Sequence, residues 1–344
     1  MKKHFATIAK TSLILVYLVI VAGASVRMTG SGMGCPDWPK CFGYYIPPTD
    51  IVALTWAANR QFESGQLIVK DEKLLVANED FITGDTFDES RWSPYTKHDY
   101  AIFNPLHTWI EYLNRLVGAL AGLAVLIMAI FSLKFWVANK RVTMFSWLAL
   151  FLMGFQGWLG ANVVYSVLNP VKITVHMIVA LIIVAVILYI IREAQSKPSA
   201  LKYDSLFRNL LWCALFLTLI QIVFGTQVRQ FVDEQVKVLG YDQMESVLRN
   251  PTVGFYVHRT FSILIFLLNL FLFIRNRKYN LGFDKINWVI GLIGIEIISG
   301  MAMYYFHFPF GSQAVHLIIA SVLFGIQFWM GLAAQKAQKK MVIE

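Results

Sequence analysis

The sequence has little charge and little cysteine. Of its 344 residues, 15% are charged and 57% are apolar, whereas a soluble globular domain has about a quarter charged residues. This composition argues against a soluble domain. The sequence also lacks a low-complexity tract, a linker, and the Arg-rich and Ser-rich leader that directs proteins to organelles. We therefore expect a continuous folded chain in a bacterial membrane.

The apolar residues fall into blocks long enough to cross a bilayer, which requires roughly 20 residues per helix. We predict an all-α integral membrane protein with eight membrane-spanning helices. The predicted spans are 12–30, 106–133, 142–165, 171–192, 206–230, 252–275, 284–305 and 312–334.

The net charge of +9 does not predict a nucleic-acid partner, because the basic residues gather in short connections between the spans. That distribution is typical of cytoplasmic connections. The connection 31–103 has eleven acidic and six basic residues, so we expect it outside the cell membrane, with both termini in the cytoplasm. Lys2 and Lys3 before an apolar run resemble a cleaved signal peptide. The end of this run recurs later in the chain, however, which favours a retained helix.

Four motifs of the first half recur in order in the second half, which indicates an internal repeat. We predict two repeated four-helix bundles in parallel orientation, in residues 1–200 and 201–344, with the long outer loop 31–103 between helices 1 and 2 as the main difference. The matched motifs are Gly23–Arg27 with Gly225–Arg229, Glu111–Arg115 with Phe255–Arg259, Gly154/Gln156/Gly160 with Gly294/Glu296/Gly300, and Val175–Ala180 with Val315–Ala320.

The three cysteines fall into two groups. Cys213 lies inside a span, and we expect it to be a small core residue. Cys35 and Cys41 lie in the loop 31–103. A cysteine pair in an oxidising compartment can form a disulfide. Zinc is the alternative, although two thiols supply only half of the usual four ligands.

Histidines inside a membrane are costly and point to function. His258 and His316 lie in spans 6 and 8 at matching depth, and facing imidazoles from two helices of one bundle can hold haem. His176 lies in span 4 at a position that repeats that of His316. A hydrogen bond across a helix interface, or a proton relay, is the alternative for each ring.

Four arginines lie at the predicted outer ends of helices, where the positive-inside rule disfavours them. Haem has two propionates, and the planar guanidinium binds carboxylates through a fork of donors. We therefore expect propionate contacts, the alternative being side chains that extend to the lipid headgroups. These arginines are Arg27, Arg115, Arg229 and Arg259.

Glu111 is an acidic residue in a mostly apolar span. It shares a helix face with His107 and Asn114, which are four residues before and three residues after it. A buried carboxylate beside a cofactor can act as a general base or stabilise positive charge. An ion pair with Arg115 or Arg27 is the alternative. Glu296 has no such motif, and we expect it to pair with an arginine within a span.

These features together resemble the haem A synthase family over nearly the whole chain. The resemblance implies oxidation of the C8 methyl of haem O to a formyl group, through hydroxymethyl and gem-diol stages, to give haem A for cytochrome oxidase. The residues that carry it are Glu111 and Arg115 in span 2, His258 and Arg259 in span 6, His176 and His316 in spans 4 and 8, and the Cys35/Cys41 pair.

The resemblance also implies a role for each half. The first bundle would bind the substrate haem, and the second would hold a haem b cofactor. The cysteine pair is linked to redox chemistry in part of the family. The implied residues are Glu111 as the catalytic carboxylate; His176, Asn114, Arg27 and Arg115 around the substrate haem; and His258, His316, Arg229 and Arg259 around haem b.

Asn114 departs from the family pattern, which has histidine at this place. The internal repeat fixes the register, because Asn114 aligns with His258. His107 lies about 10 Å further along the helix, at roughly 1.5 Å per residue, so we do not expect it to bind the same iron. Either the substrate haem is five-coordinate, or the chain has a variant activity.

Two other functions remain open. A membrane cytochrome b would carry electrons and hold two permanent six-coordinate haems, and a haem transporter or chaperone would release its cargo unchanged. For the enzyme, the expected partners are haem O, the lipid bilayer, a haem O synthase and an electron acceptor. The electron acceptor's identity, the source of oxygen and the oligomeric state have no signal in the sequence.

Overall fold

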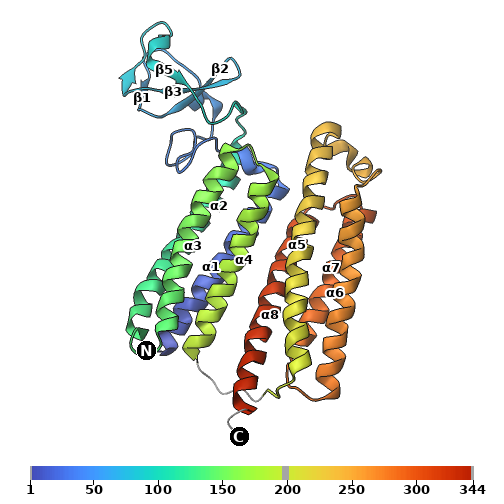
Figure 1. Cartoon of the computed structure of the whole chain (residues 1–344). Helices are drawn as coiled ribbons and strands as arrows, with labels where there is room; N and C mark the ends of the chain where they lie inside the picture. Colours follow the sequence, from blue (N-terminus) through green and yellow to red (C-terminus); the bar gives the residue numbers. More distant parts are fainter. Residues whose placement is uncertain (1, 196–200, 342–344) are drawn as a thin grey trace. The chain divides into compact units, whose positions relative to one another are not determined.

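The computed structural model describes residues 2–195 and 201–341 (Figure 1). This part of the chain contains eight helices that are long and apolar enough to span a membrane, which confirms the predicted membrane class. The predicted boundary between the two four-helix bundles, after residue 200, adjoins residues 196–200, which lie outside the described residues. The helices are α1 (Lys2–Met28), α2 (Pro105–Ser132), α3 (Lys140–Tyr165), α4 (Pro170–Gln195), α5 (Ser205–Leu239), α6 (Val253–Lys278), α7 (Ile286–Tyr305) and α8 (Ser312–Met341).

Helices α2 and α4 begin in the same way. Proline occupies the first position of each helix, where its missing N–H is not needed. The preceding asparagine, Asn104 or Asn169, accepts hydrogen bonds from backbone N–H groups of the first turn. These caps fix where the two helices start.

Three helices extend well beyond their predicted spans, one of them being α8, which continues to Met341 instead of ending at 334. α1 begins at Lys2 instead of residue 12, and α5 continues to Leu239 instead of ending at 230. The extra turns of α5 contain the charged residues Asp233, Glu234 and Lys237. Pairs four residues apart, such as Gln230 with Glu234, stabilise a helix in water. Hydropathy marks the part of a helix that can lie in lipid, so it does not detect such extensions.

Cys213 was predicted to be a core residue, and this prediction is wrong. The residue is exposed on the surface of the chain. Lipid tails are as apolar as a protein core, so an apolar span has the same composition on its inward and outward faces. Hydropathy therefore could not decide which way Cys213 points.

The chain forms two compact units. The larger contains Met1–Tyr17, Ala124–Phe151 and Met177–Glu344. Within it, α5 and α7 each pack against both α6 and α8, so these four helices close a ring. An equivalent ring of α1–α4 remains a prediction. The core of this unit includes Phe207, Leu211, Ile265, Leu272, Val289 and Met330.

The smaller unit contains Leu18–Leu123 and Leu152–His176. Between α1 and α2 it has two small antiparallel sheets, which the sequence analysis did not predict. Strands β2 and β3 join through Asp71 and Glu72, both in the left-handed conformation (φ 49° and 59°), at a tight turn where Asn-Gly is more usual. One sheet pairs β1 (Gln61–Phe62) with β4 (Phe81–Ile82); the other has the order β2 (Leu67–Lys70), β3 (Lys73–Ala77), β5 (Trp92–Pro94).

The internal repeat extends to the backbone. After α3, Val167 and Leu168 have φ values of 51° and 61°; after α7, His307 and Phe308 have 53° and 58°. Large side chains rarely adopt this conformation. The two turns are separated by the same number of residues as Gly160 and Gly300. The match between the third and seventh helices is therefore structural as well as sequential.

Candidate functional site

Cys35 and Cys41 form a disulfide, as predicted, so zinc is no longer an alternative for this pair. Asp37, inside the disulfide loop, accepts hydrogen bonds from the backbone N–H groups of Phe42 and Gly43, at 2.5 Å and 2.9 Å. Burial raises the pKa of the Asp37 carboxyl, and these two hydrogen bonds oppose the rise. The carboxyl thus organises the loop from within.

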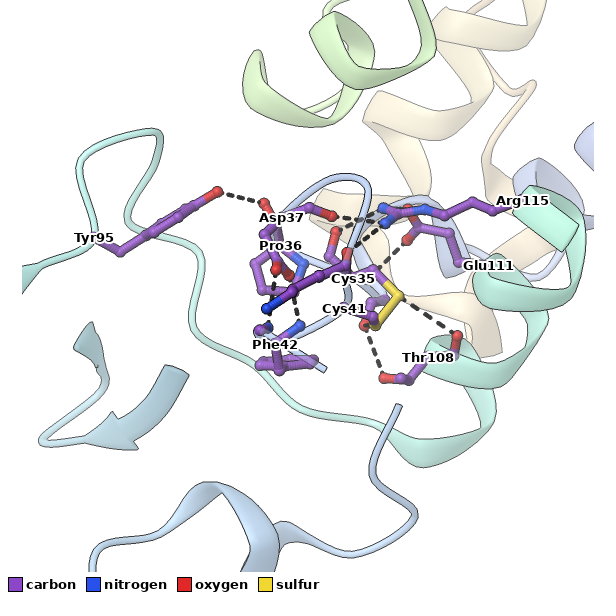
Figure 2. Close-up of a disulfide and its surroundings, with 12 residues drawn as sticks. Cys35, Pro36, Asp37, Cys41, Phe42, Tyr95, Thr108, Glu111 and Arg115 are labelled. Carbon is purple, nitrogen blue, oxygen red and sulfur yellow. Dashed lines mark hydrogen bonds and ion pairs between the residues drawn. A yellow bond between two sulfur atoms is a disulfide. The ribbon is translucent and has the colours of Figure 1, made fainter. Parts of the chain in front are cut away.

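The disulfide loop packs against the first turns of α2 (Figure 2). A β-carbon at Gly34 would overlap the backbone carbonyl of His107, so a glycine is required for this close approach. The Thr108 hydroxyl donates a hydrogen bond to the Gly34 carbonyl at 2.8 Å. These contacts hold the loop beside the predicted catalytic residue.

Glu111 joins α2 to the disulfide loop (Figure 2). The residue is 4% exposed. Its Oε2 accepts a hydrogen bond from the Cys35 backbone N–H at 2.9 Å, and its Oε1 lies 2.5 Å from Arg115 Nη2. Arg115 Nη1 donates to the carbonyls of Asp37 and Lys40 at 2.6 Å and 2.8 Å. The ion pair considered as the alternative for Glu111 is therefore present, and Arg115 already has protein partners.

The other arginines also have identifiable surroundings. Arg229 Nη2 lies 2.7 Å from Asp233 Oδ1. The Arg259 guanidinium lies 5.2 Å from the centre of the Tyr256 ring, within the range of a cation–π contact. Arg27 lies in the last turn of α1. The predicted propionate contacts of these arginines remain predictions.

His258 and His316 face each other from α6 and α8. Their ring centres are 6.4 Å apart, and the ring planes are inclined by 67°. An imidazole nitrogen lies about 2 Å from a transition metal, so two rings on opposite sides of one metal have centres separated by roughly 6 Å. The separation of the two ring centres therefore matches that of a bis-histidine iron site.

The ring of His316 is held by two polar side chains of α7. Its Nδ1 lies 2.8 Å from Ser299 Oγ and 2.9 Å from Glu296 Oε2. Metal-binding histidines usually have such a partner, which orients the ring, and Nε2 is then the nitrogen left for a metal. The prediction that Glu296 pairs with an arginine is wrong. The error arose because α7 and α8 are neighbours, and the sequence alone does not show which polar groups of neighbouring helices meet.

Glycines allow the helices to approach the histidine rings. A β-carbon at Gly225 would lie 3.2 Å from His258 Cε1, and one at Gly300 would lie 3.8 Å from His316 Cε1. Larger residues would press on these rings. The Gln221 side chain also donates a hydrogen bond to the His258 backbone carbonyl at 2.9 Å. The adjacent helix thus fixes the backbone of His258, whose ring Nδ1 has no hydrogen-bond partner among the described residues.

His176 and Asn114 belong to the smaller unit. Gln156 Nε2 donates to the His176 carbonyl at 2.9 Å. His176 Nδ1 and Asn114 Oδ1 are buried and have no hydrogen-bond partner in the described part of the chain. Among the described residues, no three His, Cys, Asp or Glu side chains are grouped to bind a metal ion. The place that His258 has in the second half is taken here by Asn114.

Several residues that support these sites were not predicted from the sequence. Asp37, Thr108 and Ser299 are polar residues in unremarkable local sequence. Gln221 could have been found, because Gln or Glu precedes a glycine by four residues in the third, fifth and seventh spans. Only two of these three instances were used to define the internal repeat.

The chain is similar to known proteins over most of its length. The cytochrome oxidase assembly protein family (COX15-CtaA) matches residues 6–328. Proteins named heme A synthase are 24% identical over 340 residues in Flavobacterium johnsoniae (90% of this chain and 92% of that protein) and 23% over 329 in Alkalihalophilus pseudofirmus (92% of each). The chain therefore belongs to the haem A synthase family, the COX15-CtaA family of cytochrome oxidase assembly proteins, as its motifs predicted.

Proposed function

We propose that this protein is a haem A synthase, which oxidises the C8 methyl of haem O to a formyl group. The facing rings of His258 and His316, 6.4 Å apart, are the observation that carries the proposal, because they fit haem and belong to a chain of this family. The proteins named heme A synthase that resemble it are similar along nearly their whole length.

The second half is proposed to hold haem b between His258 and His316. Such a haem, when bound, accepts and passes on single electrons. The chain's own contribution is to fix the rings: Glu296 and Ser299 orient His316. Arg229 and Arg259 are the proposed partners of the propionates.

The first half is proposed to bind haem O through His176, with Asn114, Arg27 and Arg115 around it. Glu111 is the proposed catalytic carboxylate. Oxidation of a methyl group on the macrocycle develops positive charge beside the ring, and a fixed carboxylate in a site of low dielectric stabilises that charge. Arg115 and the Cys35 N–H hold the Glu111 carboxylate in one position, which supports this role.

The protein spans the membrane several times. We place it in the bacterial cell membrane with both termini in the cytoplasm and the segment 31–103 outside, because the basic connections alternate with this acidic one. Haem O is the proposed substrate, and a haem O synthase and an electron acceptor are the proposed partners. A haem transporter would need no fixed carboxylate such as Glu111, and a cytochrome b with two permanent haems would need a second histidine pair.

The proposal is tested by extracting haems from cells that make haem O but lack haem A. Mass analysis should find haem A when this chain is expressed and haem O alone when it is not. A variant with His176 replaced by Ala serves as the matched control, because it should be inserted in the membrane without converting the substrate. If the wild-type chain accumulates in the membrane and only haem O is recovered, the proposed function is wrong.

A further inference from the structure

Three pairs of neighbouring helices share one arrangement. In α3/α4, α5/α6 and α7/α8, a glycine on the first helix faces a histidine ring on the second. Four residues before that glycine stands a Gln or Glu. The Gln side chain donates to the backbone carbonyl of the histidine in the first two pairs, and the Glu side chain contacts the histidine ring in the third. The groups are Gln156, Gly160 and His176; Gln221, Gly225 and His258; and Glu296, Gly300 and His316.

The pair α1/α2 keeps the glycine and changes the other two positions. A β-carbon at Gly23 would lie 4.0 Å from Asn114 Oδ1, so Asn114 occupies the place that histidine has in the other pairs. Four residues before Gly23 stands Val19, which cannot donate or accept a side-chain hydrogen bond. The pair α1/α2 thus has neither the histidine nor the polar side chain that contacts the histidine in the other pairs.

The two changes belong together. This pair has neither the imidazole nor the neighbouring polar side chain, which indicates that this place is not built to hold an axial ligand. The amide is also shorter than an imidazole, and it binds iron poorly. Its Oδ1 is nevertheless buried without a hydrogen-bond partner among the described residues, and burial of an unpaired polar atom costs roughly 1–3 kcal/mol. A small polar molecule beside Asn114 would remove that cost.

We propose that Asn114 marks the open side of a haem held by His176 alone. There its Oδ1 accepts a hydrogen bond from a water molecule, and its amide N–H donates one to a diatomic ligand that replaces the water. This inference rests on the proposed function, which places haem O in the first half of the chain. Asn114 is then a positioning residue for the exogenous ligand. The two halves differ in this respect: His258 and His316 close both sides of one haem, whereas the first half leaves one side accessible.

The test uses carbon monoxide as the probe. The purified full chain is loaded with haem O, reduced under nitrogen and titrated with CO. One haem should bind CO, and this CO-binding haem should be absent from the His176→Ala variant. In Asn114→His the affinity of this haem for CO should fall at least tenfold, because the new imidazole occupies the open side. In Asn114→Leu the CO should remain bound, with a shifted C–O stretching frequency because the amide hydrogen bond is absent.

The results that overturn the inference are distinct from those that overturn the function. A wild-type chain whose haems are all low-spin and do not bind CO contradicts the inference, even if it converts haem O. An unchanged CO affinity in Asn114→His, or an unchanged stretching frequency in Asn114→Leu, does so as well. A chain that binds CO through a His176-dependent haem and never converts haem O supports the inference and contradicts the proposed function.

Discussion

The carboxylate of Glu111 lies 2.5 Å from the guanidinium of Arg115, one turn further along α2. The same carboxylate accepts a hydrogen bond from the Cys35 backbone. Glu111→Gln keeps the shape of the side chain and removes its charge. We expect haem binding by His258 and His316 to persist and conversion of haem O to fall at least a hundredfold per folded molecule, because one electrostatic contact in an active site contributes about 10²–10³ in rate.

The ratio of haem O, hydroxylated intermediate and haem A, measured per folded protein, checks this prediction. The matched control is Glu234→Gln, which changes an exposed carboxylate on α5 and should leave the ratio as in the wild type. A purely structural ion pair predicts low yield with normal conversion in the protein that folds. Normal conversion by Glu111→Gln would therefore remove the catalytic role of this residue.

Glu296 provides a separate test of the second half. Its carboxylate lies 2.9 Å from His316 Nδ1 and should raise the basicity of the ring. Replacing such a partner changes metal affinity about 10–100-fold. A tenfold loss of affinity for the ferric haem alone shifts the one-electron midpoint potential by about 59 mV. We expect Glu296→Gln to keep the low-spin spectrum and raise the midpoint potential by roughly that amount. An unchanged potential in a redox titration would show that the contact does not tune the haem.

The cysteines predict a simple labelling pattern. Cys35 and Cys41 are joined, and Cys213 is exposed on the chain surface. In detergent and without reductant, a thiol reagent should modify Cys213 alone, as measured by intact mass. After reduction, all three cysteines should react. Modification of three cysteines before reduction would contradict the disulfide.

Asp204 should stabilise the start of α5. It accepts a hydrogen bond from the Phe207 N–H at 2.7 Å and pairs with Arg275 through both carboxylate oxygens, at 3.0 Å and 2.9 Å. Burial opposes ionisation of Asp204, but these hydrogen bonds outweigh it and hold the pKa of its carboxyl below the usual value. A depressed pKa in the folded state means that this stabilisation is present above the unfolded pKa of about 3.9 and is lost as the pH falls below it.

Asp204→Asn should therefore lower the thermal stability of the detergent-solubilised protein at neutral pH. Asparagine caps a helix about as well as aspartate, so the loss of stability should come from the charged pair with Arg275. Asp284→Asn, at an exposed residue, is the matched control and should melt like the wild type. Equal melting temperatures for the two variants would contradict the stabilising role.

The sequence predicted the features that depend on composition and spacing. Eight spans follow from the apolar blocks, the place of His258 opposite His316 follows from their matching depth in spans 6 and 8, and the disulfide follows from two nearby cysteines. The strands β2 and β3 were not predicted, because they are short and their turn at Asp71 and Glu72 lacks glycine. Contacts between helices, such as that of Glu296 with His316, depend on helix rotation, which an apolar sequence does not determine.

The claim that His258 and His316 together hold haem is tested most directly by the absorbance of the purified chain. The wild type should show a low-spin b-type spectrum, and His258→Ala and His316→Ala should each lose it. His307→Ala, which changes a histidine in the turn after α7, should retain it. A normal low-spin spectrum in both the His258→Ala and His316→Ala variants would contradict the account.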